Sequence, residues 1–278
     1  GPAVAGVLLE HWWWGSVFLV NVPLVLTAVV LGRRFVPESR DPSGDPVDVP
    51  GAAAAVLAVG ALVFAIIEAP AQGWTSTRTL VAAGVAVLGF VLLVVRERTA
   101  AHPMLDMRLF RDRRFSVASA GIAVNFFSMF GTWFLVAQFT QLVLGFSPVA
   151  AGLLVLPFSG IMMLLAPRGA RLVARLGGPT VAALGLASGA VGLLLLAQLG
   201  QGTHAWSIVG AMVPMAVGMA ITGPPLTTSI MTAVPIAKAG VGSAMNDTNR
   251  ELGGALGVAV LGSIVPTRSG AAHEPAVA

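Results

Sequence analysis

The chain has 278 residues, of which 56% are hydrophobic and only 10% are charged, and its mean hydropathy is +0.87. A soluble domain carries about 25% charged residues, so this composition excludes an ordinary water-soluble protein and predicts an integral membrane protein. Cysteine is absent, which excludes disulfides and thiolate metal sites. The net charge of +4 does not indicate a nucleic-acid partner, because the basic residues cluster in short loops between apolar runs.

The apolar runs follow one another as membrane-spanning helices, since about 20 apolar residues cross the hydrocarbon core of a bilayer. A partial span over residues 1–9 ends before Trp12, Trp13 and Trp14, which suit a membrane interface. Eight full spans are predicted after it, at residues 16–31, 51–69, 80–95, 116–145, 148–167, 181–199, 206–231 and 242–265. The predicted fold is therefore all-α, a polytopic membrane helix bundle.

Counting the partial span as the first, the fifth and sixth spans (residues 116–145 and 148–167) form a hairpin that turns at Gly145-Phe146-Ser147-Pro148. Polar side chains inside it are costly in lipid, so they are expected to face protein or a wet cavity. At about 100° per helical residue, Gln138 and Gln141 share one stripe, whereas Asn125 lies nearly opposite, on a stripe that includes Met129, Thr132 and Thr140. One stripe is expected to face a cavity and the other a neighbouring helix.

The basic residues test this span count. If the first partial span exits to the outside, 14 of the 16 Lys and Arg residues fall on the cytoplasmic side, and only Arg78 and Arg268 do not. The positive-inside rule predicts such a bias, which a miscounted span would scramble. The most basic stretch, residues 96–115, is predicted as an interfacial helix, with an irregular basic loop as the alternative.

An ordered series of motifs resembles the major facilitator superfamily. GPAVAGVLL, followed by WGSVFLVNVP, is similar to the antiporter-motif helix (fifth span) and the start of the sixth span of its drug:proton antiporters. VPESRDPSGDPVDVPG and HPMLDMRLFRDRRF resemble the loops before and after the two extra central spans of the fourteen-span branch. QLVLGFSPVAAGLLVLP, RGARLVARLGG, GPP and NDTNRELGGALGVAVLGSI then follow in the family's order.

The resemblance implies a partial major facilitator fold, a fragment running from the fifth span to the thirteenth. Residues 1–32 would end the N-terminal bundle as spans five and six. Residues 33–115 would hold a cytoplasmic loop, the two extra central spans and the basic linker. Residues 116–265 would supply five spans of the C-terminal bundle, and residues 266–278 would form a tail.

Some positions depart from the family pattern. Ala5-Gly6 stands where the antiporter motif has paired glycines, and Gly15 and Ser16 replace its usual Arg and second Trp. In the loop after the sixth span, Ala174 occupies the position of an acid that could latch an inner gate. Such a latch is therefore in doubt in this half of the molecule.

The implied function is that of a secondary active transporter, not an enzyme, which exports drugs or other amphipathic molecules by alternating access. It would lie in the cell's inner (plasma) membrane, need no cofactor beyond the proton gradient, and have as partners the lipid bilayer, a small-molecule substrate, protons and the missing spans of its parent chain. The main proton-carrying acid is expected in those spans. The alternatives are an integral-membrane enzyme acting on lipid-linked substrates and a non-transporting scaffold or sensor.

Four groups of candidate site residues follow. Each also has a purely structural explanation, namely interhelical hydrogen bonding, close packing or a static kink. The substrate-path candidates are Asn125, Met129, Thr132, Gln138 and Gln141. The antiporter-motif helix contributes Gly1, Pro2 and Gly6, and the inner-gate candidates are Gly169, Arg175, Asn246 and Arg250. The hinge candidates are Gly223, Pro224 and Pro225, which are expected to interrupt the eighth span.

Three further expectations concern single features. Gly253 and Gly257 predict close helix packing. Glu68, near the outer end of its span, is interpreted as a solvated interfacial acid rather than a proton carrier. No catalytic residue, nucleotide-binding loop or metal cluster is evident in the sequence.

Overall fold

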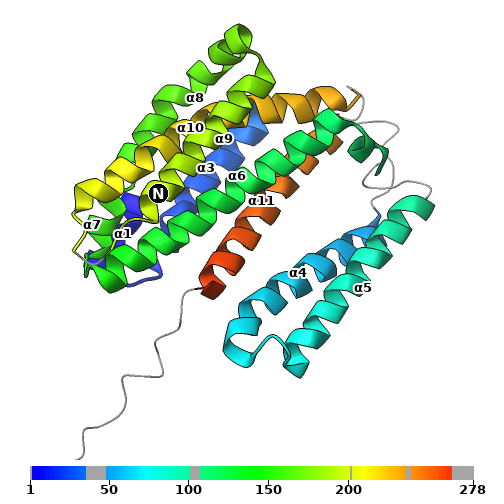
Figure 1. The fold of residues 1–278 in the computed structure, drawn as a ribbon, viewed down its shortest axis with the longest axis horizontal. Helices are drawn as coiled ribbons and strands as arrows, with labels where there is room; N and C mark the ends of the chain where they lie inside the picture. Colours follow the sequence, from blue (N-terminus) through cyan, green and yellow to red (C-terminus); the bar gives the residue numbers. More distant parts are fainter. Residues whose placement is uncertain (1, 36–47, 101–106, 201, 236–238, 265–278) are drawn as a thin grey trace, which may run out of the picture. The chain divides into compact units, whose positions relative to one another are not determined.

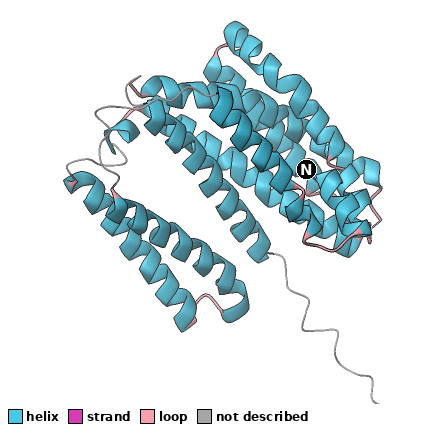
Figure 2. Ribbon diagram, turned by 180° about the vertical axis from the view of Figure 1, so that it is seen from behind, coloured by secondary structure: helices cyan, strands magenta, loops and turns pink. Residues whose placement is uncertain are grey.

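The computed structural model describes residues 2–35, 48–100, 107–200, 202–235 and 239–264. Within these ranges the chain consists of helices joined by short turns, without a strand (Figure 2). The helices, labelled in Figure 1, are α1 (Pro2–His11), α2 (Ser16–Leu19), α3 (Asn21–Phe35), α4 (Val49–Gln72), α5 (Thr77–Thr99), the 3₁₀ turn η1 (Met107–Arg111), α6 (Arg113–Gln138), the π-helical turn η2 (Phe139–Val143), α7 (Pro148–Leu153), α8 (Leu156–Leu176), α9 (Gly178–Leu196), α10 (Ala205–Ala233) and α11 (Ala239–Ile264).

Seven helical stretches in the described residues are long and apolar enough to cross a membrane. They are Ser16–Phe35, Val49–Gln72, Thr77–Thr99, Arg113–Val143, Pro148–Leu176, Gly178–Leu196 and Ala205–Ala233. These stretches agree with seven of the eight predicted full spans. Helix α11 is long enough, with 26 residues, but its first half holds Asp247, Arg250 and Glu251, so its role as the remaining span stays a prediction. Helix α1, with 10 residues, corresponds to the predicted partial span.

The chain divides into two compact units, each built from separated parts of the sequence. The first comprises Gly1–Pro46 and Val136–Thr228, and the second comprises Val47–Leu135 and Ser229–Ala278. The predicted division into segments 1–32, 33–115, 116–265 and 266–278 follows the chain rather than these contacts and remains a prediction.

The predicted hairpin turn is present, and local chemistry explains it. Gly145 has φ +69°, a conformation that glycine adopts without steric cost. Ser147 then caps α7, because its Oγ accepts a hydrogen bond from the amide of Ala150 at 3.3 Å. Before the turn, α6 passes into the π-helical turn η2, where the hydroxyl of Thr140 donates to the carbonyl of Val136 at 2.8 Å. Gln141 lies in η2, so its angle from Gln138 departs from the regular helical spacing assumed above.

The expected interruption at Gly223-Pro224-Pro225 is wrong, because α10 runs unbroken from Ala205 to Ala233 with both prolines inside it. The two prolines remove the amide donors that the carbonyls of Ala220 and Ile221 would otherwise meet. A membrane helix tolerates this loss where neighbouring groups compensate. The interfacial helix predicted at residues 96–115 is replaced by the end of α5 and the short η1, and residues 101–106 lie outside the described ranges.

Helices α4 and α5 form an antiparallel hairpin in the second unit (Figure 1). Their axes approach closely, because a Cβ built on Gly89 would lie 2.9 Å from the Cα of Ala58. At one end, the carboxylate of Asp48, whose side chain is 2% exposed, caps α4 and accepts from Nε of Arg96 at 3.0 Å. At the other end, Arg78 approaches Glu68 at 4.0 Å. This hairpin therefore carries an ion pair at each end.

Candidate functional site

The best-defined polar site in the second unit lies along the seam between α6 and α11 (Figure 1). A Cβ built on Gly253 would overlap the carbonyl oxygen of Ala123, and one on Gly257 would overlap that of Phe127. A Cβ on Gly131 would lie 2.8 Å from the carbonyl oxygen of Gly257. The two backbones therefore touch, as small residues permit in membrane helices, and the predicted close packing at Gly253 and Gly257 is confirmed.

The same contacts fix the direction of the two helices. Residues 123, 127 and 131 of α6 meet residues 253, 257 and 261 of α11 in rising order, so the helices run parallel. Three predicted spans separate them in the sequence, so four successive reversals would also bring α11 back to the direction of α6. This agreement supports the predicted alternation of the spans between the two sides of the membrane.

Arg250 is the twelfth of the 26 residues of α11, and its predicted place at the inner mouth of a span stays a prediction. Its guanidinium carbon lies 5.3 Å from the centroid of the Phe126 ring on α6, within the range of a cation–π interaction. Asn246, one helical turn earlier, is 6% exposed. A basic side chain thus lies midway along α11, against an aromatic ring of the neighbouring helix.

The substrate-path candidates differ in burial. Asn125 and Thr132 on α6 are buried, Met129 and Gln138 are half-buried, and Gln141 is exposed. Asn125 lies about 160° around α6 from Ala123, away from the α11 seam. Helix α6 therefore has two buried sides, one packed backbone to backbone on α11 and one that carries an amide and a hydroxyl. Their role along a substrate path stays a prediction.

The remaining candidates lie mostly in the first unit. A Cβ on Gly6 of α1 would lie 2.7 Å from the carbonyl oxygen of Pro148, so the antiporter-motif helix packs tightly on the start of α7. Gly1 and the side chain of Pro2 lie outside the described part of the chain. Gly169 is buried, and its Cβ would lie 3.2 Å from the Pro224 ring, whereas Arg175 is exposed. One inner-gate candidate thus contacts one hinge candidate.

A second glycine seam, which was not predicted from the sequence, lies between α9 and α10. A Cβ on Gly192 would lie 2.8 Å from the amide nitrogen of Met215, and one on Gly185 would overlap the hydroxyl of Thr222. The hydroxyl of Ser188 donates to the carbonyl of Pro214 at 2.7 Å across this seam. The spacing of Gly185, Ser188 and Gly192 on one helix face was the available signal.

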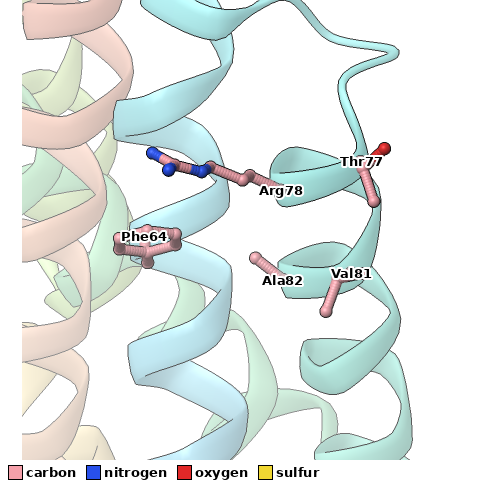
Figure 3. A pocket seen from close by; sticks show the side chains of 5 residues that line it. All are labelled: Phe64, Thr77, Arg78, Val81 and Ala82. Atoms are coloured by element: carbon pink, nitrogen blue, oxygen red, sulfur yellow. The ribbon is translucent and has the colours of Figure 1, made fainter.

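An open cleft of about 340 Å³ lies beside the α4–α5 hairpin and is lined by Phe64, Thr77, Arg78, Val81 and Ala82. Figure 3 shows the Arg78 side chain reaching from α5 toward α4 above Phe64. The side chain of Arg78 is 73% exposed and that of Glu68 is 25% exposed. This pair agrees with the interpretation of Glu68 as an interfacial acid. The negative charge of Glu68 also partly neutralises Arg78, one of the two basic residues predicted on the outer side.

Helices long and apolar enough to cross a bilayer, joined by short turns and packed through glycines, define a polytopic membrane helix bundle. The chain belongs to the major facilitator superfamily, whose family model matches residues 1–258. It is thus a multi-pass integral membrane protein of a transporter family.

Several curated relatives are similar to the chain. It is 38% identical over 275 residues to the multidrug resistance protein Stp of Mycobacterium tuberculosis, covering 99% of this chain and 51% of Stp. It is 35% identical to the multidrug efflux pump LfrA of Mycolicibacterium smegmatis, over 95% of this chain and 52% of that protein. It is 33% identical to the tetracenomycin C resistance and export protein of Streptomyces glaucescens, over 97% of this chain and 50% of that protein. The chain spans about half the length of these relatives.

Proposed function

We propose that the natural gene product containing this chain is a secondary active transporter that exports amphipathic small molecules from the cell by alternating access across the plasma membrane. The observation that carries this proposal is the family match over residues 1–258 together with relatives named for multidrug resistance, efflux or export. The buried Asn125 and Thr132 support it, because polar groups inside membrane helices mark substrate and ion pathways.

The proposal extends to the fourteen-span branch of the family, with α4 and α5 as its extra central pair. Two features of the hairpin support this assignment. Helices α4 and α5 pack on each other along their length, and the ion pairs Asp48–Arg96 and Glu68–Arg78 both lie within the hairpin. Because the charged groups at both ends of this helix pair are paired within it, the pair suits a peripheral addition to a helix bundle better than a place at the bundle's centre.

The driving force in this proposal is inward proton flow. Glu68 is a poor proton carrier, because it lies beside the exposed Arg78 at the end of its helix. The carrier is therefore expected outside the residues described here. Substrate and protons would use the same alternating cavity, which the polar side of α6 would help to line.

Dye efflux from cells that produce the natural gene product tests the function. Cells preloaded with ethidium should lose the dye faster than cells carrying the empty vector, and a protonophore should abolish the difference. Efflux that continues unchanged when the protonophore collapses the gradient would rule out proton coupling. Equal efflux from producing and empty-vector cells, with the protein shown to be in the membrane, would rule out export of this dye class.

A further inference from the structure

Three buried donors lie without a partner at one level of the α6–α11 seam. Among the residues that the structure describes, Oγ of Ser119, Nδ2 of Asn249 and Nε of Arg250 are inaccessible to solvent and make no hydrogen bond. Because Gly253 lies opposite Ala123 in parallel helices, Asn249 is level with Ser119, and Arg250 is one residue further along. Buried donors are normally satisfied, so three orphans in one layer point to an absent acceptor.

Helical-wheel angles place these three residues close to the faces of α6 and α11 that form the seam. Ser119 lies about 40° around α6 from Ala123, and Asn249 lies about 40° around α11 from Gly253. Arg250 lies about 20° from the direction of Gly257. Ser119 itself is 5% exposed.

The charge of Arg250 lies against a neighbouring helix. Its guanidinium carbon is 5.3 Å from the centroid of the Phe126 ring on α6, within the range of a cation–π interaction. The charge is therefore held at the contact between α6 and α11.

The acids of α11 do not meet this charge. Asp247 and Glu251 are both exposed, and neither forms an ion pair with Arg250 within the part of the chain described here. An aromatic row continues beyond the guanidinium along α6: the Phe126 and Phe130 rings stack at 6.2 Å, and Trp133 follows at 6.4 Å from Phe130. A cationic head that offers several hydrogen-bond donors thus adjoins an aromatic body.

We propose that this site binds the anionic group of an amphipathic molecule, a carboxylate or a phosphate, which Arg250, Asn249 and Ser119 hold while Phe126 and Phe130 contact the apolar body. Oxygen anions match an arginine fork and neutral donors. The proposal rests on the proposed export function and refines it, because it assigns transported anions to this site. A phospholipid headgroup offers the same anionic chemistry, so the experiment must distinguish a bound lipid from a transported substrate.

Binding to the purified natural gene product in an uncharged detergent tests the site without requiring transport. The probes are fluorescein, an anionic dye, and ethidium, a cationic dye, followed by fluorescence anisotropy. Arg250→Gln should weaken fluorescein binding about 10- to 100-fold, the range for a lost charge-assisted hydrogen bond, and leave ethidium binding within about twofold. Arg98→Gln, which changes an exposed arginine on α5, should alter neither.

Two further variants keep the test decisive if Arg250→Gln does not fold. Ser119→Ala removes only one hydroxyl and should weaken fluorescein binding about 3- to 10-fold. Arg250→Lys keeps the charge but loses the planar fork, so it should fall between the wild type and Arg250→Gln.

Equal weakening of both dyes, unchanged fluorescein binding by the folded variants, or no fluorescein binding by the folded wild type would overturn the proposal. Displacement of fluorescein by phosphatidylglycerol would assign the site to lipid and overturn the substrate assignment. Failure of the efflux experiment above would leave the binding result standing, so the two proposals can fail separately.

Discussion

Gly257→Ala probes the α6–α11 seam with a single added methyl group. The new Cβ would lie 2.9 Å from the carbonyl carbon and Cα of Phe127 and closer still to its oxygen. Ordinary contact begins at 3.4 Å, so the helices must separate by at least 0.5 Å (3.4 minus 2.9). Both partners are backbone atoms, so no rotamer change relieves the overlap.

A gap of 0.5 Å already forfeits about a quarter of the dispersion attraction along a contact. Overpacking of this kind costs about 1–3 kcal/mol, which outweighs the gain of about 1 kcal/mol in helix propensity from Gly to Ala. At roughly 2–4 °C per kcal/mol for a chain of this size class, the melting temperature should fall by several degrees. Scanning fluorimetry of the tryptophans in detergent measures it.

Gly240→Ala is the matched control, because it lies on the same helix and a Cβ there meets nothing within 4 Å. It should keep or slightly raise the melting temperature, since only the propensity gain remains. If Gly257→Ala kept the wild-type melting temperature, or if the melting temperatures of both variants fell equally, the seam would not be packed as described.

Three other perturbations follow from the structure. Asp48→Ala should lower the melting temperature more than Glu68→Ala, because the buried Asp48 also caps α4, and a cap alone contributes about 1 kcal/mol while an exposed pair contributes about 0–1 kcal/mol; equal effects would contradict this. Pro224→Ala restores a helical amide, so it should keep or raise the melting temperature yet slow dye efflux if α10 bends there; unchanged efflux would exclude a hinge at this proline. Single cysteines beside Arg98 and Arg171 report on topology without background, since the chain has no native cysteine; both should react with a membrane-impermeant thiol reagent only after permeabilisation, and labelling from opposite sides would refute the span alternation.

Hydropathy sufficed to predict seven of the eight full spans, because crossing lipid imposes a length and a composition that are visible in the sequence. The hairpin turn could also be predicted, because Gly145 and Ser147 act locally: Gly145 adopts the positive φ of the turn and Ser147 caps α7. The partner of Gly253 was not: a glycine stripe predicts a close neighbour, but nothing local identifies a helix about 130 residues earlier in the chain.

The break expected at Pro224 and Pro225 was wrong for a physical reason of the same kind. A lost amide donor interrupts an isolated helix more readily than a packed one, so α10 continues through both prolines.

The two glycine-dependent contacts described above constrain motion differently. At the α6–α11 seam, backbone meets backbone at Gly253 and Gly257, so any separation exposes carbonyls and loses contacts at once. A Cβ built on Gly169 would instead lie 3.2 Å from the Pro224 ring and 3.4 Å from the carbonyl oxygen of Ala220, a carbonyl whose amide donor is removed by Pro224. Small rotations there cost little hydrogen bonding. The contact between α6 and α11 is therefore expected to resist separation more strongly than the contact between α8 and the proline pair of α10.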